Sequence, residues 1–186
     1  MQDYIDAGLT LDFHKRLADA YMVATHDPKH WEVKRSYAHF TRAIRAQYAE
    51  IPVKVTFTQE DPYAESADLF RDIDRGRMAI YTCADLPADH SLAQGDLNTM
   101  CRAVHDYWAH YGGFTREHYR FDIGMVAGNF GEEMAFRRHR AMMLPSAWMA
   151  LACETRMQAA CNNLLMAEGE YVDQKAALLP AWAFKL

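Results

Sequence analysis

The sequence predicts a mainly α-helical domain of the α+β class, with a small two-stranded sheet in its N-terminal half. Apolar residues recur at three- and four-residue spacing over 31–50 and in several segments after residue 96, which is typical of helices that face a core. Apolar and polar residues alternate over 53–58, as in a half-buried strand. With 186 residues, of which 51% are hydrophobic, the chain is expected to form a single domain, residues 1–186.

The N-terminal half is expected to contain both helices and strands. Helices are predicted at 10–24, 31–50 and 66–73, and strands at 53–58 and 77–82. The segment His26-Asp27-Pro28 separates the first two helices, and Pro52 ends the second. Because the strands flank a short helix, they are predicted to pair in parallel if that helix is the crossover connection.

Three longer helices are predicted in the C-terminal half, at about 96–111, 129–143 and 146–168. Gly112 and Gly113 are expected to end the first of them, and Pro145 to separate the other two. Asn129 and Ser146 have the side chains that commonly cap a helix N-terminus, so they are the expected caps of the second and third helices.

The last segment, 170–186, is an apolar tail. Its large apolar residues stand close together, at Leu178, Leu179, Trp182 and Phe184. Because such a group in water is an aggregation hazard, we expect the tail to pack on the body of the protein or on a partner, such as a second copy of the chain.

Composition and charge exclude several classes of protein. The net charge is −5, the pI is about 6.0, and no basic run is longer than residues 137–140, so nucleic-acid binding is not expected. The N-terminus does not resemble a secretory signal, and no stretch of about 18 apolar residues could cross a membrane. The four cysteines stand far apart, which favours reduced thiols over disulfides or a thiolate zinc site.

Polar residues interrupt the apolar stripes of the three C-terminal helices. The polar pairs are four or seven residues apart, so each pair lies on one face of its helix: Asp106 with His110, Glu132 with His139, and Glu154 with Gln158. His105 lies about a quarter turn away from the first pair. If the three helices face one another, these side chains form a buried cluster of carboxylates and imidazoles.

Such a cluster has two interpretations, because buried charges must either bind something or pair with one another. In the first, the ligands of a divalent metal are Asp106, His110, Glu132, His139 and Glu154, and His105 and Gln158 lie around them. Oxygen and imidazole ligands favour iron, manganese, zinc or magnesium, and such an ion could activate water or oxygen. In the second, the acids pair internally with arginines such as Arg156 or Arg102.

A third interpretation rests on the adjacent pair His105-Asp106. Metal-dependent phosphohydrolases of the HD class combine such a pair with a separate histidine and a later aspartate. His90 or His39 and Asp122 could supply those two residues.

Several short motifs run in a fixed order through residues 36–160. They are Ser36-Tyr37 with Gln47, Asp61-Pro62-Tyr63, His90-Ser91-Leu92, Cys101-Arg-Ala-Val-His-Asp106 with His110, Gly131-Glu-Glu-Met-Ala135 with His139, and Cys153-Glu-Thr-Arg-Met-Gln158. This order resembles a family of uncharacterised proteins encoded by tailed phages, some of them domains of larger polyvalent or virion-associated proteins. Ser91, Met157 and residues 159–161 depart from the family pattern.

The resemblance implies a phage origin and adds His90 and Arg156 to the residues around the cluster. It is compatible with a metal-dependent enzyme, hydrolytic or oxidative, and with a virion-associated or assembly protein whose cluster is a salt-bridge network. A protein of either kind would work in the host cytoplasm or in the virion. In the second case the apolar tail would bind phage structural proteins.

Overall fold

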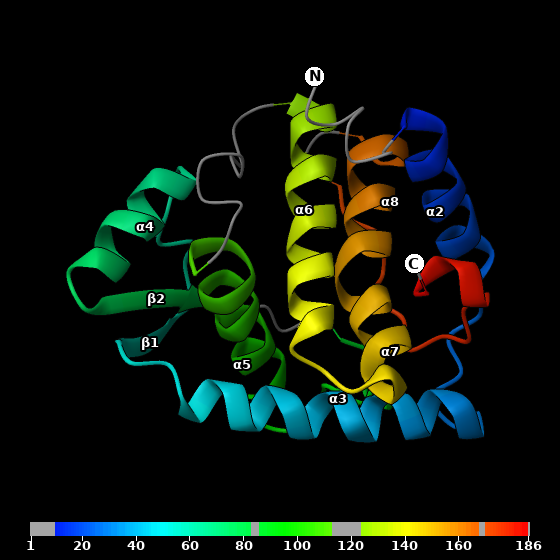
Figure 1. Ribbon diagram of the computed structural model, residues 1–186, viewed down its shortest axis with the longest axis horizontal. Coiled ribbons are helices and arrows are strands. Elements are labelled where there is room, and N and C mark those ends of the chain that lie inside the picture. Colours follow the sequence, from blue (N-terminus) through cyan, green and yellow to red (C-terminus); the bar gives the residue numbers. More distant parts are fainter. Residues whose placement is uncertain (1–9, 83–85, 113–123, 168–169, 186) are drawn as a thin grey trace.

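The computed structural model describes residues 10–82, 86–112, 124–167 and 170–185 (Figure 1). These residues form a mainly helical structure with one small two-stranded sheet in the N-terminal half, which confirms the predicted fold class. The N-terminal elements are α2 (Leu11–Val23), α3 (Trp31–Ala49), β1 (Lys54–Thr58), α4 (Ser66–Asp74) and β2 (Arg77–Tyr81). Each of them lies within about two residues of its predicted position.

The sheet is parallel, and α4 is the crossover between its strands, as predicted. The register pairs Lys54 with Arg77 and Thr58 with Tyr81. Buried residues of α4 and β2 form a small core of their own, which consists of Leu69, Phe70, Ile73, Met78 and Ile80. Ala103 of the next helix also belongs to this core. The sheet therefore packs beside the helix that carries the first polar motif.

The C-terminal half contains helices whose regular α-helical hydrogen bonding is interrupted. The helix predicted at 96–111 consists of α5 (Leu97–Val104) followed by a π-helical segment, η1 (His105–Tyr111). The next helix is α6 (Gly124–Ala141). The helix predicted at 146–168 consists of η2 (Pro145–Ala147), α7 (Trp148–Ala152), a second π-helical segment η3 (Cys153–Met157), and α8 (Gln158–Leu165).

The two predicted helix caps are wrong. Asn129 lies inside α6, which begins at Gly124. Ser146 lies inside η2, which begins at Pro145. Proline is well suited to the first position of a helix because its fixed φ angle is helical and its missing N–H needs no partner, so the helical turn starts one residue before the serine.

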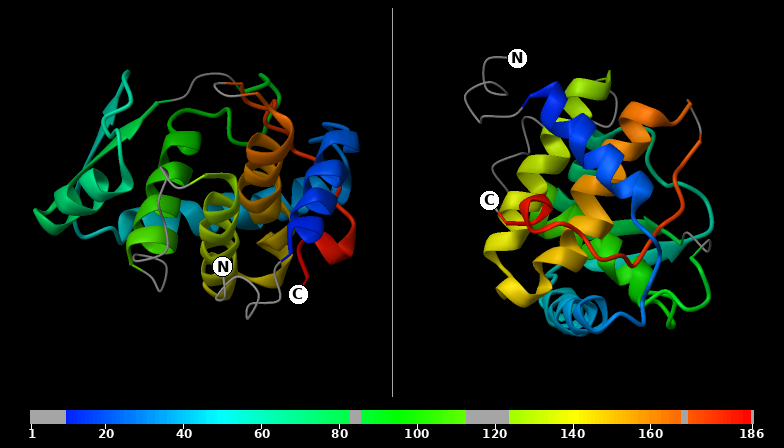
Figure 2. Two further views of the ribbon diagram at one scale, coloured as in Figure 1. Left: turned by 90° about the horizontal axis from the view of Figure 1, so that it is seen from above. Right: turned by 90° about the vertical axis from the view of Figure 1, so that its right-hand side faces the viewer.

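The order of the helices in space determines which polar residues can meet. In two perpendicular views, α6 lies between α5 on one side and α8 on the other, and α2 packs against α8 (Figures 1 and 2). Helix α3 crosses the ends of this layer and contacts α5, η2 and α7. The main core gathers fully buried side chains from all of these helices, among them Leu17, Tyr21, Phe40, Ile44, Phe136 and Leu151. Helix α6 therefore has two buried sides.

The C-terminal tail packs on its own chain. Ala177 forms an antiparallel bridge with His26, and Leu179 is 5% exposed. Phe184 packs partly against the main core, whereas Leu178 and Trp182 stay 44% and 37% exposed. The expected packing is thus complete for Leu179 only. A role of the tail in binding another chain stays a prediction.

Candidate metal centre

The first π-helical segment brings two histidines together. In a regular α-helix, residues five apart point about 140° away from each other. The backbone of a π-helix closes on the fifth residue, so its turn is wider and such residues meet. The Nε2 atoms of His105 and His110 lie 2.8 Å apart, and their rings are perpendicular with centroids separated by 4.4 Å. Segments of this kind are frequent at functional sites.

Glu132 of α6 completes a group of three. Its Oε2 lies 3.2 Å from His105 Nε2, and its Oε1 lies 3.4 Å from His110 Nε2. One ligand atom from each residue lies within 4.8 Å of the other two. The side chain of His110 is fully buried, while those of His105 and Glu132 are 14% and 19% exposed. The group is therefore open to solvent on the side of His105 and Glu132.

No placement of protons on the Nε2 atoms of His105 and His110 turns all three contacts of this group into hydrogen bonds. If only His105 carries a proton on Nε2, lone pairs of His110 and Glu132 face each other. If only His110 carries one, lone pairs of His105 and Glu132 face each other. If both do, two N–H groups meet head to head at 2.8 Å. A cation placed among the three atoms would attract a lone pair of each residue.

The pKa values of the three residues depend on one another, and a metal ion would have to displace the proton that the raised pKa of His105 favours. Burial acts to raise the pKa of Glu132, but His105 and His110 outweigh it and hold this pKa well below its usual range. Burial, together with the charge of His105, lowers the pKa of His110 to about 4. The pKa of His105 is raised, because Glu132 and Asp106 outweigh the opposite effect of burial. At neutral pH the group therefore presents a carboxylate and a neutral His110.

The distances suit a small divalent ion. For a tetrahedral zinc site with metal–nitrogen bonds of about 2.0–2.1 Å, neighbouring ligand atoms lie about 3.3 Å apart. The observed separations of 3.2 and 3.4 Å match this value, and the separation of 2.8 Å between the imidazoles is shorter by about 0.5 Å. A small rotation of one ring would bring it to the same value.

His139 of α6 lies next to the group but outside it, with its ring centroid 6.5 Å from that of His105. The Nε2–H of His139 donates to Gln47 Oε1 at 2.7 Å, because the amide nitrogen of Gln47 is directed to the carbonyl of Met142. His139 Nδ1 thus keeps its lone pair, and it is buried without a hydrogen-bond partner among the described residues. Burial, together with the charges of His105 and His110, lowers the pKa of His139 to about 3, so this nitrogen is a neutral base.

Asp106, a predicted ligand, does not join the group. The sequence prediction assumed an α-helix, in which Asp106 shares a face with His110, but the π-helical turn places His105 there instead. Burial raises the pKa of Asp106 to about 6, while His105 and Arg102 act in the opposite direction. Asp106 is therefore a nearby carboxyl group and not one of the three converging residues.

Glu154, another predicted ligand, lies in a separate network. It accepts hydrogen bonds from the hydroxyl of Tyr37 and the amide of Gln174. His90 Nδ1 accepts from the backbone N–H of Leu92, so its protonated Nε2 faces Glu154 Oε1 at 3.3 Å. These buried donors already satisfy the carboxylate. Glu154 and His90 therefore do not meet Glu132, and the predicted convergence in one site is not observed.

Arg156 lies in a third network, on the opposite side of α6. Its Nε lies 2.8 Å from Glu133 Oε2, and the other oxygen of Glu133 pairs with Arg137 at 2.8 Å. Glu133 and Arg137 are four residues apart on α6, and the side chain of Glu133 is 0% exposed. The adjacent acids Glu132 and Glu133 were the sequence signal for this separate network, because neighbouring residues of a helix point about 100° apart and therefore face different partners. Among the described residues, no hydrogen bond links Gln158 to any of the three networks.

The HD interpretation gains no support from this arrangement. Its adjacent pair is split, because His105 belongs to the converging group and Asp106 does not. Of the two further residues it needs, His90 contacts Glu154, and Asp122 lies outside the described residues. This hypothesis stays untested.

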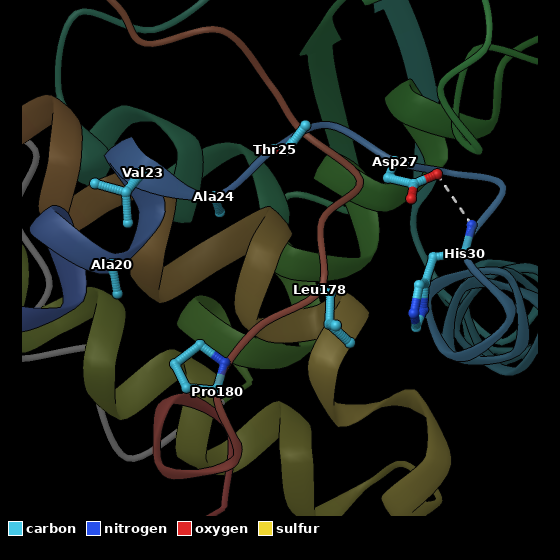
Figure 3. A pocket seen from close by; sticks show the side chains of 8 residues that line it. All are labelled: Ala20, Val23, Ala24, Thr25, Asp27, His30, Leu178 and Pro180. Atoms are coloured by element: carbon cyan, nitrogen blue, oxygen red, sulfur yellow. Dashed lines mark hydrogen bonds between the residues drawn. The ribbon is translucent and has the colours of Figure 1, made fainter.

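A hollow in the surface lies away from the histidine group, between the end of α2 and the tail (Figure 3). Leu178 and Pro180 of the tail line it together with residues of α2 such as Ala20 and Val23. Three polar side chains also line it, those of Thr25, Asp27 and His30, and the backbone N–H of His30 donates to Asp27. This mostly apolar lining offers no group of metal ligands.

No protein-family model matches the chain, and the searches of curated proteins and of solved structures found no match. No helix in the described part of the chain is long and apolar enough to cross a membrane. The geometry of the side chains is therefore the basis on which function is inferred.

Proposed function

We propose that this protein binds one divalent transition-metal ion through His105, His110 and Glu132. The observation that carries the proposal is the meeting of two imidazole nitrogens and a carboxylate within 4.8 Å. No placement of protons on the imidazole nitrogens satisfies the three approaches, whereas a cation would be attracted by all three residues. Two imidazoles and one carboxylate are the ligand set of many catalytic zinc sites and of non-haem iron(II) sites, so zinc, iron and manganese are the proposed ions.

The proposed activity is that of a metal-dependent enzyme, either hydrolytic or oxidative. Three protein ligands leave coordination positions open, and His105 and Glu132 are in contact with solvent. A divalent ion in such a site acts as a Lewis acid and lowers the pKa of water. Two groups of this chain could move protons beside it: the lone pair on His139 Nδ1, held by Gln47, and the carboxyl group of Asp106.

A second candidate function is that of a virion-associated or assembly protein. It is supported by the networks around Glu133 and Glu154, in which the buried carboxylates are paired within the chain. The resemblance to tailed-phage proteins is compatible with both candidates, and a phage origin is itself part of the proposal.

Titration of chelator-treated protein with zinc, manganese and anaerobic iron(II) tests the proposal by calorimetry. We expect one site per chain with a Kd in the micromolar range or below. The variant Glu132→Gln keeps the shape of the side chain but loses its charge, and it is expected to bind at least about 100-fold more weakly, about 2.7 kcal/mol. The control is His39→Ala, which removes a histidine of α3 outside the group. Equal affinities of Glu132→Gln and the wild type would refute the site.

A further inference from the structure

Part of the C-terminal tail, residues 172–177, forms a strap that is hydrogen-bonded to the segment after α2. The backbone N–H of Asp27 donates to the carbonyl of Ala176 at 2.8 Å. In the opposite direction, the backbone N–H of Ala176 donates to His26 Nδ1 at 3.0 Å. Ala176 and Ala177 are 0% exposed. The strap is therefore held closed at this point by the side chain of a histidine.

Other contacts of the strap lead to buried polar groups of the core. The side-chain amide of Gln174 donates to the buried carboxylate of Glu154. The backbone N–H of Lys175 donates to the hydroxyl of Tyr21 at 3.0 Å, and the amine of Lys175 donates to the backbone carbonyl of Tyr21 at 3.1 Å. The strap is thus held mainly by hydrogen bonds, which depend on the protonation of their donors and acceptors.

The contacts of His26 determine which of its nitrogens carries the proton. A backbone N–H can only donate, so His26 Nδ1 accepts from Ala176 and has a lone pair. The proton of the neutral ring therefore lies on Nε2, which faces Asp89 Oδ1 at 3.1 Å. The side chain of His26 is 24% exposed, so the ring is in contact with solvent. The closed strap requires the neutral form of His26.

A second proton on His26 is incompatible with this contact. The new Nδ1–H would meet the N–H of Ala176 head to head at 3.0 Å, while Nε2–H would keep its contact with Asp89. Opening of the strap therefore takes up a proton, and an equilibrium that takes up a proton shifts toward the open state as the pH falls. Histidine is the side chain whose charge changes between pH 5 and 8.

The other charged groups around His26 do not replace the lost acceptor. The ring of His90 stacks on it with centroids 5.7 Å apart, and the Nε2 proton of His90 faces a buried carboxylate. The amine of Lys175 is directed to backbone carbonyls of α2. The carboxylate of Asp27 accepts from two backbone N–H groups that follow it. Asp89 is thus the acid that stabilises a charged His26.

We propose that the contact between His26 and Ala176 is a pH-sensitive switch, which holds the strap closed when His26 is neutral and opens it when His26 is protonated. Leu178 and Pro180, which line the hollow beside α2, follow the strap directly. Opening removes this wall of the hollow and exposes the side chain of Leu179, which is 5% exposed in the closed state. None of these residues belongs to the proposed metal centre, so the switch is independent of it.

Amide hydrogen exchange of the full-length protein from pH 7 to pH 5, corrected for the intrinsic effect of pH on exchange, tests the switch. The uptake of one proton changes the opening equilibrium by at most about tenfold per pH unit. Protection of the Ala176 amide should therefore fall by about 10- to 100-fold over this range. The amides of Phe40 and Ile44, in the core of α3, should keep their protection, because the strap opens without unfolding the domain.

The decisive variant is His26→Asn, because the side-chain oxygen of asparagine can accept from Ala176 in place of Nδ1 and does not titrate. Its protection at Ala176 should be independent of pH, whereas the matched control His39→Asn on α3 should respond like the wild type. Asp89→Asn, at an exposed position, should move the loss of protection to lower pH by up to about 0.7 pH unit.

Three results would overturn the proposal. The first is wild-type protection at Ala176 that stays constant from pH 7 to pH 5. The second is the same pH dependence in His26→Asn as in the wild type. The third is a parallel loss of protection in the core of α3, which would show that acid unfolds the whole domain.

Discussion

Replacing Arg156 by methionine should destabilise the protein strongly, because it leaves a buried carboxylate with half of its partners. The side chain of Glu133 is 0% exposed, and Arg156 pairs with its Oε2. Removing one partner of a buried ion pair costs about 3–5 kcal/mol. Arg137 still pairs with the other oxygen of Glu133, so we expect the lower end of that range, about 3 kcal/mol. For a chain of this size, that loss lowers the melting temperature by roughly 6–12 °C.

The double variant Glu133→Gln/Arg156→Met separates the cost of an unpaired charge from the cost of lost packing. Methionine can fill the space between Phe13 and Phe136, and no buried charge then remains at either position. Replacement of a whole buried pair is often neutral, so the double variant should recover most of the loss. The matched control is Arg71→Met, which breaks the exposed pair of Arg71 and Asp68 and should cost less than about 1 kcal/mol.

Urea denaturation followed by circular dichroism measures these differences. The reasoning is refuted if Arg156→Met costs less than about 1 kcal/mol. It is also refuted if the double variant is no more stable than the single one, because the loss would then come from packing and not from the unpaired acid.

Three further predictions concern ligand binding, pH and the tail. Zinc at 100 times its Kd should stabilise the protein by about 2.7 kcal/mol, roughly 5–11 °C in melting temperature, and a chelator should reverse this in wild type and leave Glu132→Gln unchanged. Burial raises the pKa of Cys153 to about 12 and that of Cys101 well above its usual value, so both thiols stay protonated in the folded state. Stability should then be complete below about pH 8.5 and fall above it, as the unfolded chain releases these protons, and Cys153 alone should account for a loss of about 2 kcal/mol at pH 10. A urea midpoint that is constant from pH 7 to pH 10.5 would contradict this prediction. Truncation after Ala177 removes the buried side chain of Leu179, which should cost about 1.5–3 kcal/mol, and an unchanged melting temperature would show that the tail contributes nothing.

The order and type of the helices and strands could be predicted from the sequence, because each apolar pattern is long enough to show its period. The segments 31–50 and 53–58 correspond closely to α3 and β1. The periodicity also identified the three helices that carry buried polar groups. Those predictions depend on the period of the apolar residues along the sequence, and most of the segments adopt the secondary structure that this period indicates.

The residues of the converging group could be predicted only in part, because the group depends on a local change in the helix. A π-helical turn at His105–Tyr111 exchanges Asp106 for His105 on the face of His110, and α-helical spacing contains no signal of that change. The separation of Glu154 from Glu132 depends on tertiary packing, since Tyr37 and Gln174 come from distant parts of the chain. The phage origin suggested by the motifs stays a prediction.

Elemental analysis of untagged protein, purified without chelator, tests the central claim most directly. We expect close to one equivalent of zinc, iron or manganese per chain in the wild type and in His39→Ala. We expect less than a tenth of that in Glu132→Gln and in His110→Ala. Wild-type protein that is folded and free of metal, and that takes up none when zinc, manganese or iron(II) is added, would contradict the account.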